Sequence, residues 1–271
     1  MKAILHGAVE RPAVTVVGVW DPFVASHREL MCALRDHART CQCAAVAVLI
    51  DPPPGTVSHV RFRYGTAGWP VYDSVMARVH RIRECGVDAV LRISFAPRDY
   101  AGSAARFLDL VRAHVSLAEI WLGALQHLGP GENGSEAAVA RYAAAHGLTL
   151  TMLPLPPVGG YDVRALLASG RLHDAAAIVG HPPTWSRPPS GTLRLAWAPG
   201  DYQVVSWRPG DVATAQNTQI VRLAAVQGGP ARLEWPDAHI PFLAFVAGPA
   251  DLAPVQTVAP LEQLPAGRYA H

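Results

Sequence analysis

Runs of apolar residues alternate along the chain with stretches of helical spacing. Residues 13–20 (AVTVVGVW) and 44–51 (AAVAVLID) are almost continuously apolar, which is typical of strands buried on both faces of a parallel sheet. Between them, residues 26–40 place apolar side chains on one stripe of a helix. The same patterns predict strands at 87–95, 117–123 and 148–157, and helices at 72–86, 103–114, 135–147, 161–170 and 171–180. This alternation predicts an α/β fold with a doubly wound parallel sheet.

The pattern changes at the proline-rich stretch 180–191 (GHPPTWSRPPSG). Beyond it, short alternating runs are separated by Pro-Gly and Gly-Gly turns, without any helical period. The sequence therefore predicts two domains. Residues 1–185 form a Rossmann-like domain, and residues 186–271 form a small β-rich barrel or meander.

Composition narrows the classes of function. Half of the 271 residues are apolar, 16% are charged and the net charge is +2, without a block of basic residues. This favours a large core and argues against nucleic acid as a partner. We expect no signal peptide, no transmembrane helix and a cytoplasmic location, whereas the oligomeric state stays open. The spacing of the four cysteines fits no disulfide framework.

A metal site is a weaker possibility near the second of the apolar runs. His37, Cys41 and Cys43 lie close together in sequence, but a fourth ligand is missing. Reduced thiols without a metal are the expected state of these cysteines.

The turn after the first apolar run is the strongest candidate for chemistry. In a doubly wound sheet, ligands bind at the carboxyl ends of the strands near the point where the strand order reverses. Residues 21–27 (DPFVASH), called the signature turn below, lead from the first strand to a helix N-terminus, where backbone N–H groups favour an anion. His27, in the first turn of that helix, could contact a phosphate there.

Several segments in one order resemble a known family. Residues 18–27 (GVWDPFVASH) resemble the signature G-x-F-D-G/P-x-H-x-G-H of the HxGH nucleotidylyltransferases. LIDPPPG, RIRECGVDAVLRISF, IWLGALQHLG and VGGYDVRALLASGRLHDAAAIVGHP are similar to successive segments of one branch, the FAD synthetase (FMN adenylyltransferase) domain of bacterial bifunctional riboflavin kinase/FAD synthetases. The resemblance covers about residues 13–185.

The resemblance implies roles for individual residues. In the family the histidine at position 27 stabilises charge on the α-phosphate of ATP, and a single well-placed cation can matter greatly for such a step. Arg164 matches the arginine of the I-S-S-T-x-I-R phosphate motif. The expected site is completed by nucleotide-binding positions at Asp21, Val24, Ser26, Gly159 and Gly160.

The chain also departs from the family pattern. Val24 replaces the first signature histidine, and Ser26 replaces the glycine before the second. Both serines and the threonine of the phosphate motif are absent, and Gln126 and Leu128 stand where the family has aromatic residues. No G-F-P-T-A-N motif follows Ser190, so riboflavin kinase activity is not expected.

The resemblance implies a divergent nucleotidylyltransferase that acts at the α-phosphate of ATP or a related adenine nucleotide, with Mg²⁺, and has FMN or FAD as possible ligands. A specialised pathway and an acceptor other than FMN would fit the departures. Two alternatives stay open. One is a nucleotide- or flavin-binding protein without turnover. The other is a hydrolase or lyase that acts on a cofactor-like small molecule.

Overall fold

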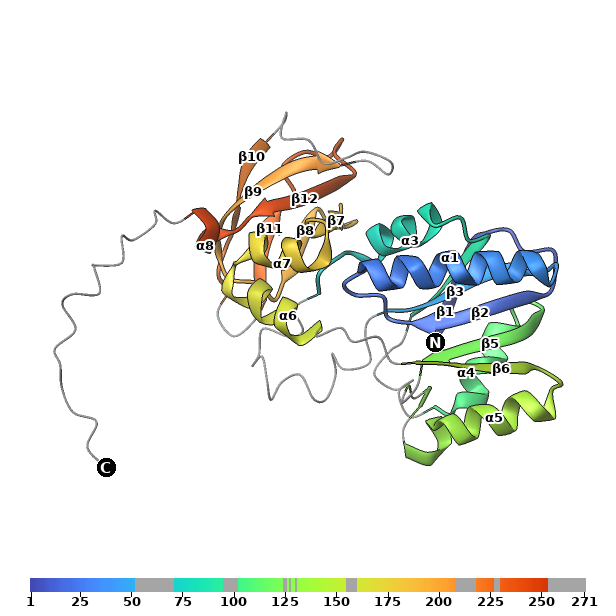
Figure 1. Ribbon diagram of the computed structural model, residues 1–271. Helices are drawn as coiled ribbons and strands as arrows, with labels where there is room; N and C mark the ends of the chain where they lie inside the picture. Colours follow the sequence, from blue (N-terminus) through green and yellow to red (C-terminus); the bar gives the residue numbers. More distant parts are fainter. Residues whose placement is uncertain are drawn as a thin grey trace, which may run out of the picture.

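The computed structural model describes residues 1–51, 71–94, 102–123, 126, 128–129, 131–154, 160–207, 218–226 and 230–252. Its elements fall into a mixed sheet with covering helices and a second group of antiparallel strands (Figure 1). The α/β fold class predicted from the sequence is confirmed. No helix in these ranges is long and apolar enough to cross a membrane.

The first sheet has six strands in the order β1-β4-β3-β2-β5-β6. All neighbouring strands pair in parallel except β1, which runs antiparallel to β4 at the edge of the sheet. Strand β1 was not among the strands predicted from the sequence. The strands are β1 (Lys2–Gly7), β2 (Ala13–Gly18), β3 (Ala44–Asp51), β4 (Ala89–Ser94), β5 (Leu117–Gly123) and β6 (Thr149–Leu153). The order reverses between β2 and β5, which is the switch point expected to bind ligands.

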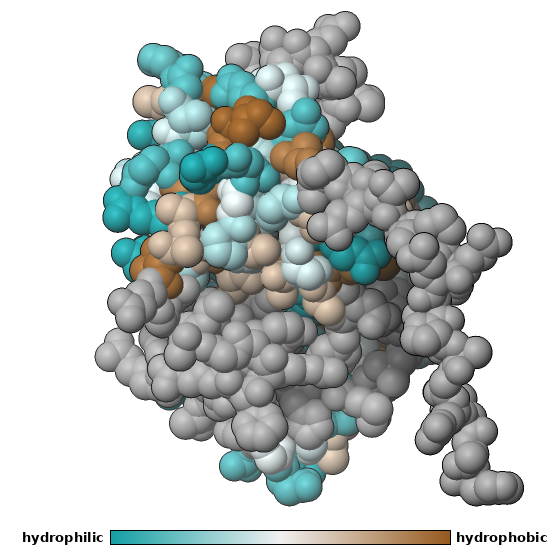
Figure 2. Space-filling model, turned by 90° about the vertical axis from the view of Figure 1, so that its left-hand side faces the viewer, coloured by the Kyte–Doolittle hydropathy of each residue, from teal (hydrophilic) through white to brown (hydrophobic). Residues whose placement is uncertain are grey.

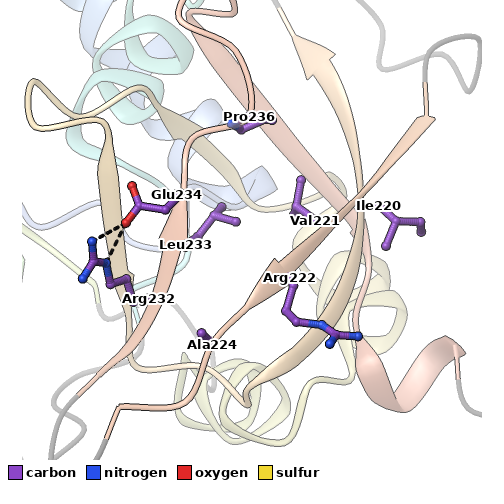
Figure 3. Close-up of a pocket in the computed structure, with 8 residues that line it drawn as sticks. All are labelled: Ile220, Val221, Arg222, Ala224, Arg232, Leu233, Glu234 and Pro236. Carbon is purple, nitrogen blue, oxygen red and sulfur yellow. Dashed lines mark hydrogen bonds and ion pairs between the residues drawn. The ribbon is translucent and has the colours of Figure 1, made fainter.

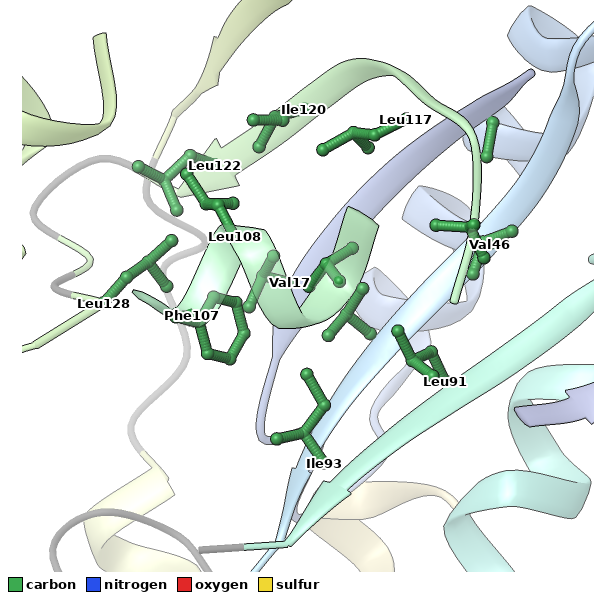
Figure 4. Close-up of a cluster of buried hydrophobic side chains, with 14 of the residues drawn as sticks. Val17, Val46, Leu91, Ile93, Phe107, Leu108, Leu117, Ile120, Leu122 and Leu128 are labelled. Carbon is green, nitrogen blue, oxygen red and sulfur yellow. The ribbon is translucent and has the colours of Figure 1, made fainter. Parts of the chain in front are cut away.

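Helices cover both faces of this sheet (Figure 1). One face packs on α1 (Ala25–Thr40) and α3 (Val75–Glu84), because their apolar stripes meet alternate strand residues such as Val16 and Leu49. The other face packs on α4 (Ala104–Arg112) and α5 (Glu136–Ala145), which follows the short helix η4 (Gly131–Gly134). Figure 4 shows Phe107 and Leu108 of α4 over the side chains of Val17, Leu91 and Ile93. Burial on both faces explains why these strands are continuously apolar.

The C-terminal strands, β7 to β12, form a separate antiparallel group. Four pair in the order β10-β9-β12-β7, and β11 pairs with β8. A single bridge between Ala224 and Arg232 joins β10 to β11. The strands are β7 (Thr184–Ser186), β8 (Thr192–Leu195), β9 (Gly200–Trp207), β10 (Thr218–Leu223), β11 (Ala231–Glu234) and β12 (Phe242–Ala247), followed by α8 (Pro249–Leu252).

The helices α6 (Gly160–Ser169) and α7 (Leu172–Val179) lie beside these strands (Figure 1). Val163 and Leu167 of α6 and Leu172 of α7 belong to one buried cluster with Tyr202 and Phe245 of the C-terminal strands. The core of the second group therefore begins before residue 186, and the boundary between 185 and 186 stays a prediction.

Candidate functional site

The signature turn lies at the carboxyl end of β2, next to the switch point of the sheet. Trp20 precedes the turn with φ of +55°, a left-handed conformation that is uncommon for a bulky residue. Its indole N–H donates to the carbonyl of Val48 on β3 at 3.3 Å. The ring folds back over Gly18, where an added Cβ would lie 2.5 Å from a ring carbon. Gly18 is thus required by the conformation of Trp20.

His27 occupies the third position of α1, and both its packing and its hydrogen bonding hold the ring. Its Nδ1 accepts from the backbone N–H of Val24 at 3.3 Å, and the ring packs edge-on against Trp20 with centroids 5.2 Å apart. Burial lowers the pKa of His27 to about 4, although the Pro22 carbonyl favours the charged form. The imidazole is therefore neutral near pH 7. The hydrogen bond at Nδ1 assigns the proton to Nε2.

Asp21 fixes the start of the signature turn. Its fully buried carboxylate accepts from the backbone N–H of Tyr72 at 3.0 and 3.2 Å and from that of Asp73 at 3.0 Å. Burial raises the pKa of Asp21, while Arg78, Arg164 and the backbone hydrogen bonds favour the charged form. These contacts connect the signature turn to residues 51 positions and more along the chain.

Arg164 of α6 contacts the signature turn itself. Its guanidinium donates to the backbone carbonyl of Asp21 at 2.8 Å and lies 3.8 Å from the Asp21 carboxylate. The residue is buried. The structure thus brings Arg164 to Asp21 and gives its guanidinium a structural partner, while His27 lies at the other end of the same turn.

The remaining predicted positions differ in what they face. Val24 is buried and belongs to the cluster that contains Val163 and Leu167 of α6. The Ser26 hydroxyl is buried and makes no hydrogen bond within the described part of the chain. Gly160 is the first residue of α6, whereas Gly159 lies outside the described residues.

Buried charged residues behind the turn were not identified as a group from the sequence. Arg78 of α3 is fully buried, donates to the Val19 carbonyl at 2.7 Å and pairs with Asp51 at 3.0 Å. Arg92 of β4 pairs with the other oxygen of Asp51 at 3.0 Å. The signal for Arg78 was present, because this arginine lies on the apolar stripe between Val75 and Ile82.

The side chains near the end of α1 that were candidate metal ligands have other surroundings in the structure. The His37 ring pairs with Glu119 of β5 at 2.8 Å, while Cys41 is exposed. Within the described ranges, no three His, Cys, Asp or Glu side chains are grouped as ligands for a metal ion.

A groove of about 550 Å³ lies between β10 and β11 (Figure 3). Its charged side chains pair with others, Arg232 with Glu234 and Arg222 with Asp201. Figure 2, in which the left-hand side of Figure 1 faces the viewer, shows apolar residues among hydrophilic ones on the part that is coloured. The groove therefore offers a ligand few uncommitted polar groups.

Comparison with known proteins decides the family. The model of the family described as FAD synthetase matches residues 7–164, which include strands β2 to β6 of the first sheet, the signature turn and Arg164. The chain belongs to the FAD synthetase family. Membership supports an adenylyltransferase-type function at the level of the family, and this part of the chain corresponds to the region in which the sequence resemblance was found.

The curated relatives of this FAD synthetase family member are longer than the region that matches. The bifunctional riboflavin kinase/FMN adenylyltransferase of Escherichia coli strain K12 is 27% identical over 191 residues, and the protein of the same name from Shigella flexneri matches equally. Each alignment covers 66% of this chain and 57% of the relative, so the chain matches little more than half of their length.

A solved structure extends the likeness of fold beyond the FAD synthetase family domain. The crystal structure titled macrolide-efflux protein from Streptococcus pneumoniae has a TM-score of 0.59 and is 15% identical. The superposition covers 93% of this chain and 90% of the chain of the macrolide-efflux protein. At this identity the likeness concerns the fold, and it includes the C-terminal strands.

Val24→His, which restores the first signature histidine, is expected to leave any activity unimproved and to destabilise the protein. The side chain at position 24 faces the buried cluster with α6, so an imidazole there would be buried without a partner, at a cost of about 1–3 kcal/mol. Urea unfolding measures this cost. Ala25→His, at the exposed neighbouring position, is the control and should unfold like the wild type. A faster adenylyl transfer by Val24→His than by the wild type would contradict the placement of this side chain in the buried cluster.

The lowered pKa of His27 predicts a pH-dependent stability. Between about pH 4 and 6.5 the unfolded chain binds a proton at this residue that the folded protein does not. The stabilisation by neutral His27 is therefore complete above pH 6.5 and is lost as the pH falls toward 4, with a total on the order of 3 kcal/mol. Between pH 6.5 and 4 the urea midpoint of the wild type should fall more steeply than that of His27→Gln. Parallel curves would contradict the prediction.

Proposed function

We propose that this protein is a divergent adenylyltransferase that binds ATP with Mg²⁺ and transfers its AMP group to a phosphorylated acceptor, with FMN as the first candidate. A phosphate oxygen of the acceptor attacks the α-phosphorus of ATP, the bond to the β-phosphate oxygen breaks, and pyrophosphate leaves. With FMN as acceptor the product is FAD. The position of His27 at the N-terminus of α1, beside the switch point, is the observation that carries this proposal.

His27 contributes as a neutral hydrogen-bond donor. Its Nδ1 is held by Val24, so the Nε2–H is fixed in direction and can contact an oxygen of the α-phosphate as charge develops there. The backbone N–H of His27 already donates to the Val24 carbonyl at 3.0 Å, so the further donors for the anion would be the N–H groups of Ala25 and Ser26. The packing of the ring against Trp20 orients the donor before the ligand arrives.

The described residues offer no cage for Mg²⁺. The carboxylate of Asp21 accepts from two backbone N–H groups, and that of Asp51 is paired with two arginines. Mg²⁺ would therefore enter as part of the substrate, in its complex with ATP, without a ligand among these two carboxylates.

One observation favours a second candidate function. Arg164 already donates to the Asp21 carbonyl, and the buried Val24 replaces the first signature histidine. A protein that binds a nucleotide or flavin without turnover would retain His27 and the fold while losing these phosphate contacts. A cytoplasmic location is part of either proposal.

The test is chromatographic detection of FAD together with an assay of pyrophosphate, after incubation of the protein with ATP, Mg²⁺ and FMN. Equal amounts of both products are expected. Calorimetric titrations with ATP–Mg²⁺, FMN and FAD distinguish the alternatives. Binding of ATP or a flavin without pyrophosphate release from FMN or a panel of other phosphorylated acceptors would favour the non-catalytic protein. Absence of any binding would overturn both proposals.

A further inference from the structure

The carboxyl ends of β2 and β5 separate at the switch point. The two strands pair as far as Val16 and Trp121, after which β2 continues to Gly18 and β5 to Gly123 without a further pair between them. On its other edge, β5 remains paired with β6 through Gly123. The ladder between β2 and β5 therefore ends before Val17 and Gly123, and this break in the pairing, called the crevice below, leaves backbone groups of both residues without a partner in the ladder.

The side chain of Gln126 closes this crevice. Its Nε2–H donates to the carbonyl of Val17 on β2 at 3.2 Å, and its Oε1 accepts from the backbone N–H of Gly123 on β5 at 3.2 Å. The backbone N–H of Gln126 also donates to the Gly123 carbonyl at 3.0 Å, which holds the residue in place. One carboxamide thus satisfies a donor on one strand and an acceptor on the other.

The space above Gly123 contains little else. A Cβ added at Gly123 would meet the Gln126 Oε1 at 3.4 Å and no other atom of the described residues within 4 Å. If the Gln126 side chain swung away, the Val17 carbonyl and the Gly123 N–H would lose the hydrogen bonds that the carboxamide makes with them.

We propose that Gln126 is a specificity-determining residue that occupies the place of a nucleotide base. A base can displace the carboxamide without loss only if it presents an N–H donor to Val17 and an adjacent acceptor to Gly123. Adenine has this pair in its N6 amino group and a neighbouring ring nitrogen, and a carboxamide has the same pair. The choice of adenine rests on the proposed function, whereas the displacement of Gln126 rests on the hydrogen bonds at the crevice.

The test uses adenosine, which lacks phosphates and therefore reports on the crevice alone. Calorimetry compares the wild type with Gln126→Ala, in which the competing carboxamide is absent. In the variant, adenosine does not have to break the two hydrogen bonds of the Gln126 carboxamide. It is therefore expected to bind roughly fivefold to tenfold more tightly to the variant than to the wild type. Gln219→Ala, at an exposed glutamine of β10, is the matched control and should bind as the wild type does. Purine riboside, which lacks the amino group, should bind more weakly to all three proteins.

A second readout separates displacement from a purely structural role. The side-chain amide signals of Gln126 in ¹H–¹⁵N NMR spectra are assigned by their absence in Gln126→Ala. They should shift on addition of adenosine to the wild type, because the carboxamide leaves Val17 and Gly123. A structural role alone predicts a less stable variant with unchanged affinity and unchanged amide signals.

The outcomes also separate this proposal from the proposed function. Equal or weaker adenosine binding by Gln126→Ala, or no adenosine binding by either protein, overturns the role of Gln126, even if FAD is formed from ATP and FMN. Tighter binding with the expected NMR shift supports the role of Gln126, even if no pyrophosphate is released.

Discussion

Asp21→Ala is expected to lower the free energy of unfolding by about 3–5 kcal/mol, because it removes one partner of a buried ionic group. The substitution leaves the N–H groups of Tyr72 and Asp73 without their acceptor, and it leaves the buried guanidinium of Arg164 without the neighbouring carboxylate. Urea unfolding followed by tryptophan fluorescence measures the change. This is a large fraction of the stability of an ordinary domain.

Two further variants make this result interpretable. Asp21→Asn keeps one oxygen for the backbone N–H groups and removes the charge, so it should fold and lose less stability than Asp21→Ala. Asp201→Ala removes the partner of Arg222 in an exposed pair and should hardly change the urea midpoint. Equal effects of Asp21→Ala and Asp201→Ala would show that the buried carboxylate does not fix the signature turn.

His27→Ala is expected to lower kcat for adenylyl transfer about 100-fold to 1000-fold, the usual cost of removing one donor to the charge that develops in a transition state. KM for ATP should change much less, because the ground-state phosphates keep their contacts with the N-terminus of α1. Because burial lowers the pKa of His27 to about 4, protonation of this ring should not limit the rate between about pH 6 and 8.

His37→Ala is the control for this experiment. His37 lies in the last turn of the same helix, and its ring pairs with Glu119 rather than with the signature turn. Its substitution should leave kcat within about twofold of the wild type, as expected for a residue remote from the reacting atoms. A small effect of His27→Ala on kcat would remove His27 from the mechanism.

The fold could be predicted because its signals are local. Strands buried on both faces are continuously apolar, so the runs at 13–20 and 44–51 identified the centre of the parallel sheet. The edge strand β1 was missed because KAILHG lies half exposed and carries a mixed pattern. The motif order also identified the family, since it depends on spacing along the chain rather than on contacts.

The site could be predicted only in part, because its key contacts join distant residues. The sequence identified His27, but the neutral state of its ring depends on burial against Trp20 and Phe23. It identified Arg164, but the donation to Asp21 joins residues 143 positions apart. Gln126 could be recognised as a departure from an aromatic motif, whereas its bridge to Val17 depends on the divergence of two strands.

The segment Tyr72–Ser74 joins the signature turn to the C-terminal strands. Its Asp73 carboxylate accepts from the Thr184 N–H at 2.7 Å, and the His181 Nε2 lies 3.0 Å from the Phe23 carbonyl in the turn. The indole N–H groups of Trp185 and Trp197 donate to the carbonyls of Tyr72 and Val71, each at 3.1 Å. The C-terminal strands therefore act as a support for the signature turn, whatever else they do. Their sequence is expected to be constrained at Thr184, Trp185 and Trp197, whose backbone or indole N–H groups reach this segment.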